Sequence, residues 1–189
     1  MPSMPILTID PTSINALGFL FDGDDESVKT DCTGSIAVET ETTTKAKTCG
    51  GQTIKEITKP TKMTITINAH VPIEIYRRVY GLAQDTAIKP GIYSYGKGSK
   101  GEKFAISAEL VDDFEDTSKL IAFLKASSQN AFTFTIDSSE DEVSMVEIVA
   151  TAYEDELGKW YHEALESELP EGLTKEKWLT NLKAEDLKK

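Results

Sequence analysis

The stretch Met63-Thr64-Ile65-Thr66-Ile67-Asn68-Ala69 decides the fold, because apolar and polar residues alternate strictly along it. Successive side chains of a strand point to opposite faces, so its four apolar residues are predicted to share one buried face. Ser35–Glu39 is a second strand-like stretch upstream. Threonine is abundant in the alternating stretches and, being β-branched, favours strands. The sequence therefore predicts a β-domain around these two segments.

A polar arm, residues 38–60, joins the two stretches. Its middle, Thr40–Gln52, consists mainly of threonine, charged residues and glycine. A segment this polar has no core of its own. We expect a loose charged loop, held out from the β-domain to contact another molecule.

The remaining chain continues the β pattern. Further strands are predicted at Leu17–Phe21, at Ile92–Tyr95 and Phe104–Leu110 as a hairpin, and at Ala131–Ile136 and Val143–Tyr153 as a second pair; Trp160–Leu165 is either a strand or a helical turn. The prediction is one domain over residues 1–189 with a mainly β (α+β) fold. It is a β-sandwich or barrel of about eight strands with a flanking helix, a long protruding arm and a C-terminal helix.

Two helices and an extended tail complete the prediction. Residues 1–16 hold three prolines near their start and are expected to be an extended N-terminal tail. One helix is predicted to start at Pro72 and to stop at Gly81. Its apolar residues recur at helical spacing: Ile73, Tyr76, Val79 and Tyr80. Arg77 and Arg78 are expected to face solvent. The other lies in the segment 173–189, where Thr174 caps it and Trp178 and Leu182 share a face.

Composition narrows the classes of function. The 189-residue chain has a net charge of −12, which disfavours sequence-specific DNA binding because the chain repels phosphates. The charge serves either solubility alone or a surface that faces DNA without binding it. The two cysteines are expected to be reduced thiols in the cytosol. No secretory signal and no apolar run of about 20 residues is present, so no membrane contact is expected.

No motif nominates an active site, a cofactor or a metal. Gly96–Gly101 matches G-x-G-x-x-G, but a strand pattern follows where the dinucleotide fingerprint needs a helix, so a hairpin turn is predicted. The acidic run Asp22–Glu26 does not match a calcium loop, because Ser27 stands where the sharp turn of that loop requires glycine. His70 and His162 are the sole histidines, without a second ligand at a zinc spacing. We therefore expect a protein that is not an enzyme.

The order of these segments resembles the major tail proteins of long non-contractile-tailed bacteriophages, the subunits of the tail tube. The resemblance runs from about Leu17 to Trp178. It is carried by the polar arm Glu39–Lys59, the threonine-rich strand Lys62–Val71, the helix closing on Tyr80-Gly81, then Tyr95-Gly96 before Phe104-Ala105-Ile106, and Gly158-Lys159-Trp160-Tyr161 leading to Glu176-Lys177-Trp178. It rests on order and spacing rather than on one diagnostic signature.

The resemblance implies a structural virion protein, assembled in the host cytoplasm, whose stacked hexameric rings form the tube through which DNA passes. Its partners would be other copies of itself, the tape measure, tail terminator and distal tail proteins, and DNA in transient non-specific passage. The implied inter-subunit arm residues are Thr42, Thr43, Thr44, Lys45, Lys47, Cys49, Gly50, Gly51, Ile54 and Ile57, with Gly50-Gly51 as hinge or tip. Trp178 and Leu182 are the candidate C-terminal contact.

Two other functions remain open at this point. A monomeric β-sandwich binding or adhesion module would use Tyr93, Tyr95 and Trp160 as a stacking platform. A hydrolase would use a carboxylate pair in the turn Asp112–Asp116.

Overall fold

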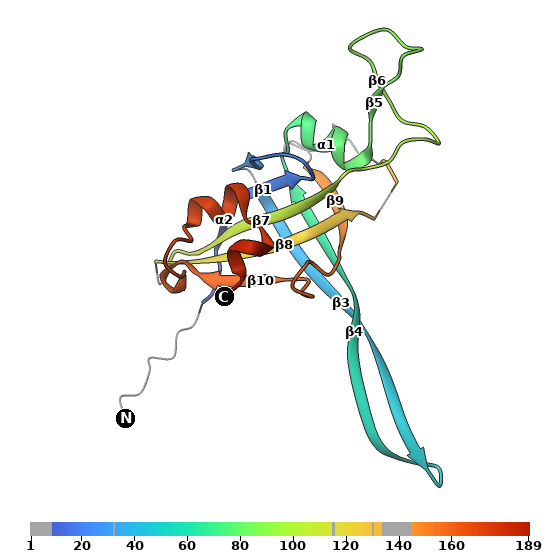
Figure 1. Ribbon diagram of the computed structural model, residues 1–189, viewed down its shortest axis with the longest axis vertical. Coiled ribbons are helices and arrows are strands. Elements are labelled where there is room, and N and C mark those ends of the chain that lie inside the picture. Colours follow the sequence, from blue (N-terminus) through green and yellow to red (C-terminus); the bar gives the residue numbers. More distant parts are fainter. Residues whose placement is uncertain (1–8, 32, 115, 130, 134–144) are drawn as a thin grey trace, which may run out of the picture.

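The protein is mainly β, as predicted, and eight of its described strands form one large curved sheet, while two short strands pair separately (Figure 1). The computed structural model describes residues 9–31, 33–114, 116–129, 131–133 and 145–189. Two short helices and two 3-10 turns accompany the strands.

Eight strands belong to the large antiparallel sheet. They are β1 (Ser13–Phe21), β2 (Val28–Thr30), β3 (Thr33–Cys49), β4 (Gln52–Ala69), β7 (Lys103–Asp112), β8 (Thr117–Ser128), β9 (Val146–Ala152) and β10 (His162–Leu165). The path through the sheet is β2-β1-β7-β8-β9-β4-β3. The strand β8 has two partners on one edge, because Lys119–Ala122 pairs with β10 and Ala126–Ser128 pairs with β9. The sheet therefore forks along β8.

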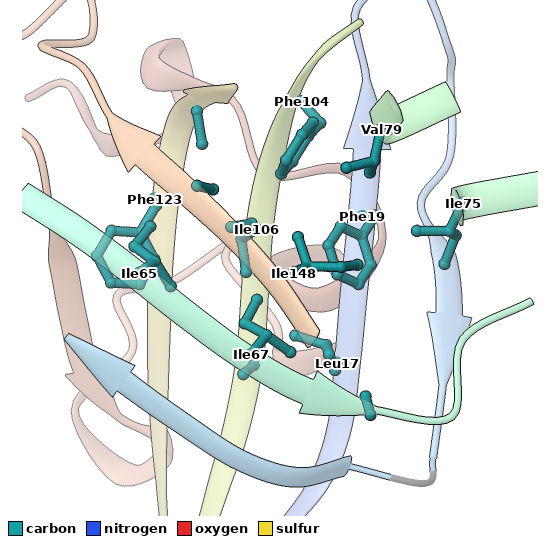
Figure 2. Close-up of a cluster of buried hydrophobic side chains, with 14 of the residues drawn as sticks. Leu17, Phe19, Ile65, Ile67, Ile75, Val79, Phe104, Ile106, Phe123 and Ile148 are labelled. Carbon is teal, nitrogen blue, oxygen red and sulfur yellow. The ribbon is translucent and has the colours of Figure 1, made fainter. Parts of the chain in front are cut away.

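The sheet curves so that its two halves enclose one apolar core (Figure 2). Leu17 and Phe19 of β1 lie opposite Ile65 and Ile67 of β4, and all four side chains are fully buried. Phe104, Ile106, Phe123 and Ile148 fill the space between them. The apolar residues of the alternating stretch Met63–Ala69 thus face the core as predicted. The two facing halves of the sheet give the fold its sandwich-like character.

The predicted flanking helix is α1 (Ile73–Tyr80), which follows Pro72 and ends at Gly81 in the left-handed region. Its buried face differs from the prediction, because Ile75 and not Ile73 points into the core (Figure 2). Arg78 was expected in solvent, and this is wrong, since its side chain is only 21% exposed beside two carboxylates. Only one side of this short helix packs against the sheet, so its tertiary contacts decide which of its residues are buried.

The C-terminal helix α2 (Lys175–Asn181) begins where predicted, with the Thr174 hydroxyl accepting a hydrogen bond from the Lys177 N–H. It covers the outer face of β8, opposite to the main core (Figure 1). There Trp178 and Leu182 pack with Leu120 and Ala122 in a second apolar cluster. The 3-10 turns η1 (Glu166–Glu168) and η2 (Ala184–Leu187) flank this helix.

Two predictions, one boundary and one pairing, differ from the structure, and a third cannot be compared with it. The extended tail was predicted to reach residue 16, but β1 already begins at Ser13, where its residues pair with β7. The predicted hairpin of Ile92–Tyr95 with the following strand is wrong, because β6 (Tyr93–Ser94) pairs with β5 (Ala83–Gln84). The strand predicted at residues 131–136 falls largely outside the described residues.

The glycine motif at Gly96–Gly101 leads into strand β7 and not into a helix, as predicted. Gly101 lies directly against the carbonyl of Val79, at the end of α1, where an added Cβ would overlap backbone atoms. Its role is therefore the close approach of two backbones.

Candidate interaction arm

The arm is a two-stranded ribbon that extends well beyond the body of the molecule (Figure 1). Strand β4 pairs with β9 only from Met63 to Ala69, and β3 pairs with β4 along its whole length. The ribbon between residues 40 and 62 therefore has no third strand, and residues 37–61 are all exposed. The prediction of a protruding arm at 38–60 agrees with this geometry, whereas the expected loose loop is in fact regular β structure.

The tip is a two-residue turn formed by Gly50 and Gly51. Cys49 pairs with Gln52, and the two glycines have φ angles of 60° and 81°. A two-residue hairpin turn with positive φ at both central residues matches the right-handed twist of the flanking strands, and glycine adopts it without strain. Of the two roles considered for this pair, hinge or tip, the structure shows the tip.

The register of the ribbon separates its residues into two faces. Thr43 pairs with Lys59, Lys45 with Ile57, and Lys47 with Lys55. Directly paired residues share a face, as do residues two apart on one strand. Four lysines therefore surround Ile57 on one face of the distal arm. We call this set the lysine face: Lys45, Lys47, Lys55, Ile57 and Lys59.

The opposite face of the ribbon is nearly uncharged. It continues the core-facing side of β3 and β4, and it carries Thr42, Thr44, Ala46, Glu56, Thr58 and Pro60. The hydroxyls of Thr44 and Thr58 are hydrogen bonded across the strands at 2.8 Å. Nearer the body, on the side of the lysine face, Lys62 and Glu41 form a partly exposed ion pair at 3.5 Å. The bulge between Glu41 and Thr42 lies beside this pair and increases the local twist.

Large apolar side chains are exposed on the arm. Ile54 is 62% exposed and Ile57 is 50% exposed. A two-stranded hairpin without a third strand or an apolar support is only marginally stable in water. The long β3 edge also presents unpaired backbone groups to solvent. The arm therefore has both the apolar side chains and the free edge that a partner would cover.

The C-terminal contact residues are placed differently from the prediction. Trp178 and Leu182 are buried in the chain's own second cluster, against Leu120 of β8. A neighbouring copy cannot reach these side chains unless α2 first leaves the sheet. The structure assigns them to the core of the chain itself.

A second projection, the loop of residues 82–102, extends from the opposite end of the molecule (Figure 1). Ile88, Ile92, Tyr93 and Tyr95 are its exposed large side chains. The Arg77 guanidinium lies 3.6 Å from the centre of the Tyr93 ring, and the Tyr95 ring packs on Phe132. Tyr95 and Trp160 line different grooves, so the three aromatics do not form the single stacking platform considered above.

The acidic turns are occupied by structural contacts. Asp112 is buried, and its carboxylate accepts hydrogen bonds from the backbone N–H groups of Asp10 and Phe114. Asp113 accepts one from the Thr12 hydroxyl at 2.6 Å. These two carboxylates join the segment before β1 to the end of β7. The hydrolase considered for this turn stays a prediction.

Arg78 forms a clamp that sequence reasoning missed. Its guanidinium donates to Glu102 at 2.6 Å and to Asp24 at 2.5 Å, and it stacks 4.0 Å from the centre of the Phe21 ring. The hydrogen bonds that Arg78 donates to Glu102 and Asp24 raise the pKa of Arg78 further above its ordinary value. Arg78 thus joins α1 both to the Asp22–Glu26 turn, which was considered above as a calcium loop, and to Glu102 at the start of β7. No local signal marks this clamp, because its partners lie far apart in sequence.

His162 and Asp155 form a second partly buried polar contact, with the ring Nε2 and carboxylate Oδ2 2.7 Å apart. Asp155 also accepts hydrogen bonds from the N–H groups of Leu157 and Lys159. Within the described ranges, no three His, Cys, Asp or Glu side chains gather in a way that would hold a metal ion. No helix of the described chain is long and apolar enough to span a membrane.

Comparison with known proteins finds similarity among solved structures. No protein-family description matches the chain, and no curated protein matches it either. Among solved structures, a chain in the cryo-EM structure of the anti-feeding prophage baseplate is similar at a TM-score of 0.46 with 9% sequence identity. The match covers 86% of this chain and 97% of that chain.

Proposed function

We propose that this protein is a structural virion protein of a bacteriophage, the subunit of a tail tube built from stacked hexameric rings. In this proposal it has no catalytic step, and its partners are other copies of itself and the other tail proteins, with DNA passing through the bore. The observation that carries the proposal is the arm, a regular ribbon whose residues 37–61 are all exposed.

The free arm favours self-assembly over a monomeric role. A marginal ribbon with exposed Ile54 and Ile57 gains most by packing on a neighbour, where its backbone edge and its apolar side chains leave water. A ring closes only through heterologous contacts, in which one surface of each copy meets a different surface of the next. A projection that reaches outside its own body is well suited to such a contact.

The order of segments along the chain supports the phage assignment. It resembles that of tail tube proteins from about Leu17 to Trp178, and the chain has the β-rich fold, the flanking helix and the long arm that this resemblance implies. The net charge of −12 suits a wall past which DNA must slide without phosphate-binding contacts.

Electron microscopy of the concentrated chain tests the proposal. We expect rings or tubes for the native chain and none for a variant in which Asn-Gly replaces residues 42–61. That replacement closes a two-residue turn on the paired Glu41 and Lys62, and it removes only exposed residues. Urea denaturation is the folding control, and both chains should unfold at a similar midpoint.

Trypsin provides a second readout on the same samples. Lys45, Lys47 and Lys55 are exposed, and we expect the first cuts there in the free chain and protection after assembly. A native chain that stays monomeric at every concentration, with and without a tail-tip nucleator, would overturn the proposal. Assembly by the shortened variant would retain a structural function but remove the arm from it.

A further inference from the structure

The distal arm is basic in a chain that is otherwise strongly acidic. Residues 42–60 contain four lysines and one glutamate, a net charge of +3, so the rest of the −12 chain carries −15. All four lysines lie on the lysine face of the ribbon, and none of them is in a salt bridge among the described residues. The arm and the body of the same molecule therefore carry opposite charges, held apart in space.

We infer that the lysine face is a docking surface for the acidic body of a second copy of this chain. This inference rests on the proposed function and names the partner and the force that brings the arm to it. The arm extends away from its own body, so its lysines meet carboxylates mainly on a neighbour (Figure 1). Ile57, 50% exposed in the middle of the four lysines, supplies the apolar contact at the centre of the surface.

The ribbon's two faces have different roles in this arrangement. The nearly uncharged face, with Thr42, Thr44 and Thr58, offers no attraction to an acidic surface. The lysine face both accelerates the encounter and selects one orientation of the arm, because complementary charge steers association and disfavours the reversed docking. Since the Debye length is about 8 Å at physiological salt, exposed charges act mainly at close range and weaken as salt rises.

Nucleic acid is the other polyanion that a lysine-bearing ribbon could meet. The body opposes it, because a DNA segment that runs along the arm also comes near a body that carries −15 outside residues 42–60. The body of a second copy is acidic as well, but its carboxylates can meet the lysine face while the extended arm keeps the two bodies apart (Figure 1). The charge distribution therefore favours a second copy over DNA.

The test compares two variants with the same change of net charge. Lys45→Gln with Lys47→Gln removes two charges from the lysine face, and Thr42→Glu with Thr44→Glu adds two negative charges to the opposite face of the same strand. Self-association is measured by sedimentation across a series of NaCl concentrations. We expect the lysine variant to associate about tenfold more weakly at low salt and the threonine variant to change by less than about threefold.

The salt series gives the second expected result. Native association should weaken as salt rises, and the lysine variant should show a shallower dependence. Equal weakening in both variants, or a native association that salt does not change, would overturn the lysine face as the docking surface. In that case loss of assembly in the shortened-arm variant would still uphold the proposed function.

A binding assay with a 30-base-pair DNA duplex at low salt separates the two polyanions. We expect no measurable binding by the native chain. Binding that the lysine variant loses, together with unchanged self-association, would assign the face to nucleic acid and overturn the inference. A native chain that never self-associates overturns both the inference and the function on which it rests.

Discussion

The indole Nε1 of Trp178 donates a hydrogen bond to the carbonyl oxygen of Ile121 at 3.1 Å. This bond joins the C-terminal helix α2 to β8, in the middle of the large sheet. The ring is 2% exposed and packs with Leu120 and Ala122 on the outer face of β8. The C-terminal helix is thus part of the fold, because it covers a sheet face that would otherwise be apolar and exposed.

Truncation of this side chain should destabilise the whole domain. We expect Trp178→Ala to lower the free energy of unfolding by about 3–5 kcal/mol, since a large buried ring leaves a cavity. Trp178→Phe should cost less, about 1–3 kcal/mol, because it keeps most of the apolar contact and loses the bond to Ile121. Urea denaturation measures both, with Phe114→Ala as control, where the ring is 84% exposed. A loss below about 1 kcal/mol in Trp178→Ala would show that α2 is not cooperative with the sheet.

The sequence predicted the strands that have one face in solvent. It did not predict β8, which has both faces buried. Met63–Ala69 alternates because only one side of β4 meets the core. Leu120–Leu124 is a continuous apolar run, because β8 has the main core on one face and α2 on the other. Periodicity disappears when both faces are buried, so this strand cannot be told from a helix by its pattern alone.

The position of the arm could be predicted from the sequence, but its regular β structure could not. Its position followed from composition, because 38–60 is too polar for a core. Its regular structure depends on the turn at Gly50-Gly51 and on the register that the turn imposes, and that register creates the lysine face. Arg78 was misplaced because helical spacing could not reveal Asp24, 54 residues earlier, as its partner.

The Arg78 clamp should contribute measurably to stability. Replacement by glutamine leaves the partly buried carboxylates of Asp24 and Glu102 without their cation, and we expect a loss of about 1–3 kcal/mol. Arg78→Lys should rescue only part of it, because an ammonium cannot repeat the forked contact. Arg77→Gln is the neighbouring control, and we expect less than about 1 kcal/mol. Thermal unfolding at low and high salt checks the series; equal losses at both arginines would contradict a specific clamp.

The Asp155 carboxylate should make stability depend on acid pH. Burial raises the pKa of this group, but hydrogen bonds from the Lys159 and Leu157 N–H groups and from the His162 ring outweigh burial and leave the pKa below its ordinary value. Because the folded-state pKa lies below the unfolded value of about 3.9, the stabilisation is present above that value and is lost as the pH falls through the folded pKa.

Asp155→Asn tests this sign directly. We expect the variant to be less stable than the native chain at pH 7, by about 1–2 kcal/mol, and the difference to shrink as the pH falls below about 4. Urea denaturation at a series of pH values measures the difference. Glu154→Gln removes an exposed neighbouring carboxylate and should change stability little at any pH. A difference that grows toward acid pH would reverse the assigned direction of the pKa shift.

The turn at Gly50-Gly51 should govern the order of the arm without affecting the body. Gly50→Val with Gly51→Val places β-branched residues at positive φ, at a cost of about 1–2 kcal/mol each, although no described atom beyond the adjacent residues lies within 4 Å of an added Cβ at either position. The arm has no core contacts, so the urea midpoint should stay unchanged while the amides of residues 42–58 exchange with solvent at least about tenfold faster. Gly98→Val is the control, because Gly98 also stands in open space without a positive φ. Unchanged exchange would show that strand pairing holds the ribbon without its turn, and a lower midpoint would show that arm and body unfold as one unit.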